Sequence, residues 1–144
     1  MNYEQVFAPV EVDGPNGLLA ILLFREYTDG LGVKFLTDAQ DPQQLAYIHY
    51  AQGHYVEQHV HNRRERMVDR TSEVLIIRKG MIQLGIYTTE GIHVKTRNLG
   101  AGDVAMLLDG GHCVRAMTEV EMVEIKQGPY LGKDKDKRSL KVRE

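Results

Sequence analysis

Residues 73–87 read EVLIIRKGMIQLGIY, two apolar runs separated by the turn residues Lys79-Gly80. Each run has the length of a strand and is too short for an ordinary helix. Similar runs recur along the chain between glycine-rich turns, and no stretch carries the sustained apolar stripe of an amphipathic helix. The expected strands cover residues 17–24, 32–36, 45–50, 55–61, 74–77, 81–87, 92–97, 103–108, 112–117 and 120–126. This pattern predicts an all-β sandwich or barrel.

The size and composition of the chain limit what else it can be. Its 144 residues are 42% hydrophobic and 26% charged, which are ordinary values for a globular domain. We expect one domain over residues 1–132 and a charged tail over residues 133–144, which stays frayed unless a partner or the barrel holds it. The formal net charge of −2 argues against a nucleic-acid partner, because such binding needs a basic excess.

Neither a membrane span nor an export signal is expected. The longest apolar run, Leu18–Phe24, is far shorter than the roughly 20 residues that cross a bilayer. Acidic residues precede this run where an export signal would need basic ones. The single cysteine, Cys113, excludes an internal disulfide and fits a reducing compartment, so we expect a cytoplasmic protein.

A histidine-rich segment, His54–His61 (HYVEQHVH), carries the first candidate site. Read as a strand, it places Glu57, His59 and His61 on one face and its valines on the other. Two imidazoles on one face can bind a single first-row metal ion. The alternative is a pair of surface histidines on an edge strand.

A carboxylate and a third histidine lie further along the chain. Glu73 shares a strand face with Leu75 and Ile77, so an interior face would place its carboxylate in an apolar cavity. Such a carboxylate needs a cation or hydrogen-bond donors. His112 follows the turn Asp109-Gly110-Gly111.

The order of these residues resembles two motifs of the cupin superfamily. Gly53, His59, His61, Glu73 and Gly80 resemble the first motif, and Gly102-Asp103, the strand to Leu108 and Gly110-Gly111-His112 resemble the second. The resemblance implies a double-stranded β-helix (jelly-roll) barrel holding one divalent transition metal ion, such as Zn, Fe, Ni or Mn. The implied ligands are His59, His61, Glu73 and His112. Eleven residues separate His61 from Glu73, and Glu65 sits at the more usual spacing, so the carboxylate ligand is Glu73 or Glu65.

The chain also resembles a subgroup of small cupins encoded near cell-surface polysaccharide genes. The matching features are His61-Asn62, Arg66, Thr71, Glu73, Gly111-His112, and Lys126-Gln127-Gly128-Pro129-Tyr130 with Asp134-Lys135 or Asp136-Lys137 nearby. The resemblance implies a homodimer and suggests a sugar-derived ligand in polysaccharide biosynthesis, but it implies no particular reaction.

Several functions fit this predicted site. The first is a metal-dependent enzyme that acts on a small polar metabolite by Lewis-acid or oxygen chemistry. In it Glu57 is a candidate base or else a surface carboxylate. Arg66 is a candidate substrate contact, since guanidinium groups suit anions, or else a partner in a structural ion pair. The alternatives are a non-catalytic barrel that binds a carbohydrate or other small molecule, and a metal-free sugar epimerase or isomerase.

Overall fold

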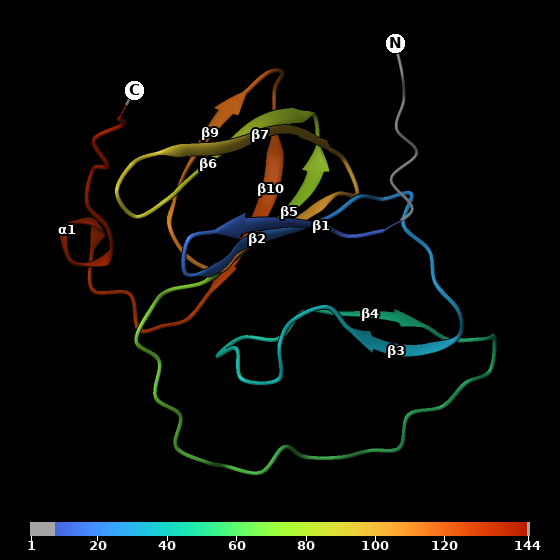
Figure 1. Ribbon diagram of the computed structural model, residues 1–144. Helices are drawn as coiled ribbons and strands as arrows, with labels where there is room; N and C mark the ends of the chain where they lie inside the picture. The colour runs from blue at the N-terminus through green and yellow to red at the C-terminus, as the bar shows by residue number, and fades with distance from the viewer. Residues whose placement is uncertain (1–7, 144) are drawn as a thin grey trace. The chain divides into compact units, whose positions relative to one another are not determined.

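The computed structural model describes residues 8–143; residues 1–7, in the predicted domain, and residue 144, in the predicted tail, lie outside the described part. Strands make up 44% of the structure and helix 3%, so the predicted all-β class is confirmed (Figure 1). The chain divides into two compact units. We call residues 8–27 with 70–143 the main unit, and residues 28–69 the insert unit. No helix within residues 8–143 is long and apolar enough to cross a bilayer.

The main unit consists of two antiparallel sheets (Figure 1). The five-stranded sheet has the order β1 (Val10–Gly14), β2 (Gly17–Leu23), β8 (Val104–Leu107), β5 (Glu73–Lys79) and β10 (Glu121–Lys126). The three-stranded sheet has the order β7 (His93–Gly100), β6 (Met81–Tyr87) and β9 (Gly111–Ala116). Strand pairing within residues 8–143 leaves both sheets open rather than closing them into a barrel.

The two sheets share one hydrophobic core. Leu75 and Ile77 alternate along β5, and Ile82, Leu84 and Ile86 alternate along β6, as expected for strands with one buried face. These residues belong to a single buried cluster, so the sheets pack face to face as in a sandwich. Each buried leucine or isoleucine contributes about 1.5–3 kcal/mol relative to an exposed position.

The turn at Gly80 carries the chain from one sheet to the other. It joins β5 of the five-stranded sheet to β6 of the three-stranded sheet, so residues 73–87 contribute one strand to each. Gly80 has a φ of 80°, and a Cβ there would lie 2.0 Å from the carbonyl oxygen of Glu119. Only glycine fits this backbone conformation and this close approach.

The insert unit contains a two-stranded antiparallel sheet of β3 (Gly32–Phe35) and β4 (Ala46–His49). The side chain of Gln44 orders the connection between them by donating to the carbonyl oxygens of Asp38 and Asp41, at 2.8 and 2.9 Å. The predicted strand over residues 55–61 is wrong, since this stretch is in no strand and all its side chains are exposed. No neighbouring strand within residues 8–143 takes up its backbone N–H and C=O groups, and a strand needs such a partner.

The charged tail folds back onto the main unit. After the short helix α1 (Lys133–Asp136), the chain runs along the turn between β6 and β7, where the Arg143 N–H donates to the Gly91 carbonyl at 2.9 Å. Leu140 lies over Gly111, since a Cβ on that glycine would be 2.4 Å from the leucine side chain. These contacts at Gly91 and Gly111 hold the tail against the main unit, whereas the tail has too little apolar surface to become ordered by itself.

Candidate functional site

Glu73 lies on the inner face of the five-stranded sheet. It is the first residue of β5 and sits directly opposite Leu107 of β8 and Lys126 of β10, so these three side chains share one face. Leu75 and Ile77 follow on the same face and belong to the core. The Glu73 side chain is only 17% exposed, which makes its hydrogen-bond partners decisive.

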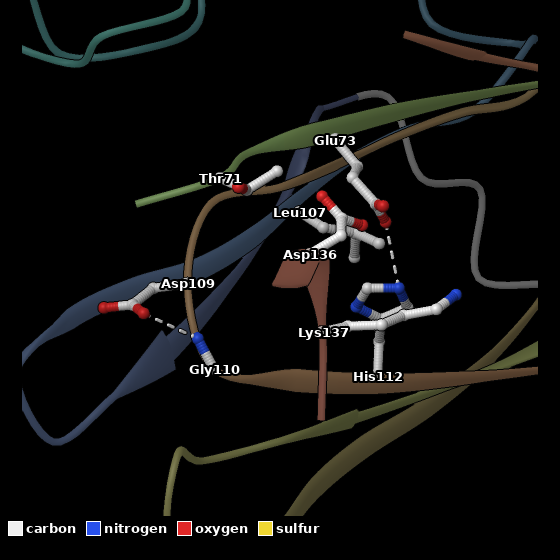
Figure 2. A pocket seen from close by; sticks show the side chains of 8 residues that line it. All are labelled: Thr71, Glu73, Leu107, Asp109, Gly110, His112, Asp136 and Lys137. Carbon is white, nitrogen blue, oxygen red and sulfur yellow. Dashed lines mark hydrogen bonds and ion pairs between the residues drawn. The ribbon is translucent and has the colours of Figure 1, made fainter. Parts of the chain in front are cut away.

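The principal partner of Glu73 comes from the other sheet. His112 is the second residue of β9 and pairs with the buried Ile86 of β6. Its Nε2 atom lies 3.0 Å from Oε2 of Glu73, so the pair connects the two sheets at one end of the sandwich (Figure 2). Both residues were predicted as metal ligands, and the fold brings them together from distant parts of the sequence.

The surroundings of Glu73 favour its ionised form. The hydrogen bond from His112 lowers the pKa of Glu73 from its ordinary value, against the opposing effect of burial. The charges of His112, Lys126 and Lys137 lower this pKa further. The site therefore offers a carboxylate and an imidazole side by side, two donor types that first-row transition metals accept.

A small pocket of about 140 Å³ surrounds this pair. Its other lining residues are Thr71, Leu107, Asp109, Gly110, Asp136 and Lys137, and Figure 2 shows them around the Glu73–His112 contact. Asp109 shapes the rim of the pocket by two contacts. Its carboxylate accepts a hydrogen bond from the Gly110 N–H at 2.8 Å and forms an ion pair with Arg70 at 3.5 Å. With carboxylates, an ammonium group and a hydroxyl in its lining, the pocket suits a small polar group.

Lys126 ties the tail to the pocket. Its Nζ atom lies 3.1 Å from Asp136, 3.1 Å from Glu124 and 3.8 Å from Glu73. The carboxylates of Glu124 and then Asp136 raise the pKa of Lys126 above its ordinary value. Sequence reasoning assigned no role to Lys126 or Asp136, although both lie in segments that it matched to the polysaccharide-linked subgroup.

The other predicted site residues lie in the insert unit. The rings of His59 and His61 meet edge to face, with centroids 5.2 Å apart. Nδ1 of His59 lies 2.8 Å from the carbonyl oxygen of Glu57, which requires that nitrogen to be the donor and leaves Nε2 as an acceptor. This is the tautomer that metal-binding histidines commonly adopt. The side chains of Glu57 and Arg66 are exposed.

The four predicted ligands thus form two pairs, Glu73–His112 in the main unit and His59–His61 in the insert unit. Within residues 8–143, no three His, Cys, Asp or Glu side chains form a group that could hold a metal ion. The alternative carboxylate, Glu65, lies exposed in the insert unit. The four-ligand site stays a prediction.

Comparisons with models of known protein families, with curated protein sequences and with solved structures gave no match. The resemblance to cupins therefore rests on the motifs of the sequence.

Proposed function

We propose that this chain is a cupin-type metalloprotein that binds one divalent transition metal ion through His59, His61, Glu73 and His112. The observation that carries the proposal is the 3.0 Å contact between Glu73 and His112. Two residues singled out by separate motifs meet across two sheets, at a pocket that neither motif alone would define. Bound there, the ion would supply Lewis-acid activation of a carbonyl or hydroxyl group.

The residues present fit such an ion. Glu73 is held in its ionised form, as a ligand carboxylate must be. The hydrogen bond from Nδ1 of His59 to a backbone carbonyl fixes the ring with Nε2 available, as in histidines that ligate metals. Imidazole and carboxylate donors together suit Zn, Fe, Ni or Mn.

The rest of the site supports an enzyme acting on a small polar metabolite. The pocket of about 140 Å³ has room for a small polar group, and its lining includes carboxylates, an ammonium group and a hydroxyl. In this proposal Glu73 binds the metal ion. Lys126 holds the Glu73 carboxylate in place from the neighbouring strand, and Asp109 fixes the rim of the pocket at Gly110. Glu57 as a base, Arg66 as a substrate contact, the jelly-roll barrel and the homodimer belong to the same proposal.

Elemental analysis of chelator-treated and reloaded protein tests the metal site. We expect about one ion per chain in the parent and less than about a fifth of that in H59A/H61A and in E73Q/H112A. The matched control is H49A/H93A, which removes two histidines outside the ligand set and should keep the full content. Equal metal content in all four proteins, or no uptake by the parent, would contradict the proposal. If the protein binds the metal ion but converts no small polar metabolite, the alternative of a non-catalytic binding barrel holds.

A further inference from the structure

The tail carries a second cluster of chemistry-bearing side chains that the proposed metal site does not use. Residues 133–144 read KDKDKRSLKVRE, six basic residues against two aspartates and Glu144. One of the aspartates, Asp136, is already engaged by Lys126 at 3.1 Å. The charge that the tail presents to solvent is therefore strongly positive.

These basic side chains gather around one open depression. Its volume is about 500 Å³, and it is lined by Lys133, Asp134, Lys137, Arg138 and Ser139. Three cations and one carboxylate leave a net positive lining. Within residues 8–143, the side chains of Lys133, Lys137 and Arg138 form no hydrogen bond and no ion pair within 4.0 Å, although the charge of Lys137 also acts on Glu73. By contrast, Lys126 nearby is surrounded by carboxylates.

The backbone beneath the depression is fixed on both sides. Asp136 is bound by Lys126, and Leu140 packs over Gly111 of β9. The segment between these anchors consists of Lys137, Arg138 and Ser139. Because its backbone is already ordered, an incoming ligand loses less binding free energy to ordering the chain.

The depression adjoins the pocket around Glu73 and His112. Lys137 lines both of them, and Figure 2 shows its side chain beside His112. A ligand whose anionic end lies between Lys137 and Arg138 could therefore reach the Glu73–His112 contact with its other end.

We propose that Lys133, Lys137, Arg138 and Ser139 bind the phosphate group of a small phosphorylated metabolite. A guanidinium fork and ammonium groups form charge-assisted hydrogen bonds to phosphate oxygens, and the serine hydroxyl adds a neutral donor. A phosphate monoester carries between about one and a half and two negative charges at neutral pH, which matches the net positive lining. No proposed metal ligand lines this depression, so the site stands without the metal.

Calorimetric titration of chelator-treated protein with inorganic phosphate and with pyrophosphate, at constant ionic strength, tests this site. We expect saturable binding to the parent and about tenfold or greater weakening in K137A/R138A. The matched control, K135A/K141A, removes the same charge from the same tail and should stay within about twofold, since neither side chain lines the depression. Equal weakening in both doubles would show diffuse attraction to a basic tail and overturn the proposal. So would the absence of saturable binding to the parent.

A third variant tests the site by a gain of affinity, which misfolding cannot mimic. Among the residues of 8–143 that line the depression, Asp134 alone carries a carboxylate, which repels a phosphate group. D134N should therefore bind phosphate more tightly than the parent, and weaker or unchanged binding would count against the site. K133A/R138A removes two side chains that line the depression but not the pocket around Glu73, and its metal content should equal that of the parent, so loss of phosphate binding and loss of metal can be told apart.

Discussion

At the scale of single residues, the position of Glu73 follows from its neighbours in the strand. Strand alternation predicted that it would share a face with Leu75 and Ile77 and would need a cation or donors there. Both expectations are confirmed, with His112 as the donor and Lys126 as a nearby cation. The Glu73 carboxylate can be partly buried at the end of this apolar strand face because its contacts with His112 and Lys126 offset the free energy lost when water is removed from it.

The lowered pKa of Glu73 makes stability depend on pH in a defined direction. A carboxyl group whose pKa is lower in the folded state stabilises the fold above its ordinary pKa of 4.5, and this contribution is lost as pH falls through the folded value. We expect metal-free parent protein to be more stable than E73Q at pH 7, with a gap that begins to narrow as pH falls below about 4.5.

Urea unfolding from pH 7 to pH 3 measures this gap. E121Q, which removes an exposed carboxylate from β10, is the matched control and should give a much smaller gap throughout. If the difference in the free energy of unfolding between the parent and E73Q stays constant down to pH 3, the charge of Glu73 makes no contribution to stability.

The sequence assigned ligand roles to Glu73 and His112, but it named Asp136-Lys137 only as one of two alternative matches to the polysaccharide-linked subgroup and gave these residues no place in the pocket. The first two lie in motifs whose order along the chain carries information. The other two enter the pocket only because the tail folds back, and that depends on contacts at Gly91 and Gly111. A run of alternating charges contains no signal for such long-range contacts.

At the scale of elements, the two candidate strands of residues 73–87 and the histidine segment differ in an instructive way. Both stretches have sequence patterns typical of strands, yet only residues 73–87 form strands, namely β5 and β6. β5 lies between β8 and β10, and β6 lies between β7 and β9, so their backbone groups are paired on both sides. Residues 55–61 have no such neighbour within the described chain. Alternation records which face would be buried, whereas pairing decides whether a strand forms.

The turn at Gly80 gives a stability prediction for the β5–β6 connection. G80A forces a side chain into a left-handed conformation and onto the Glu119 carbonyl. We expect a loss of about 2 kcal/mol in the free energy of unfolding. G100A is the control in the facing strand, where a Cβ meets only ordinary contacts at 3.9 Å or more, and it should cost less than about 1 kcal/mol. Equal losses in the two variants, measured by denaturant unfolding, would contradict this account.

At the scale of the whole molecule, burial is unevenly distributed. Every buried side chain among the described residues belongs to the main unit, and no residue of 28–69 is buried. The two units should therefore differ in local stability, because few buried contacts mean frequent local opening.

Hydrogen exchange measures this difference and also bears on the metal. In metal-free protein, the amides of β5, β6 and β8 should exchange slowest and those of residues 50–69 fastest. Adding the metal ion should slow exchange at residues 57–61 about tenfold or more, while β3 and β4 change less. Protection at Glu73 and His112 without any at residues 57–61 would restrict the ligand set to the main unit.

The pairing of β2 with β8 has a consequence for the synthesis of the chain. β2 is the most apolar strand, GLLAILL, and one of its edges is covered by β1, which directly precedes it. Its other edge pairs with β8, which leaves the ribosome about 80 residues later. At roughly 5–20 residues per second, that edge stays open for about 4–16 s. During translation the unpaired edge of β2 can therefore pair with strands of neighbouring nascent chains on the polysome. High-level expression should thus favour inclusion bodies over folded protein.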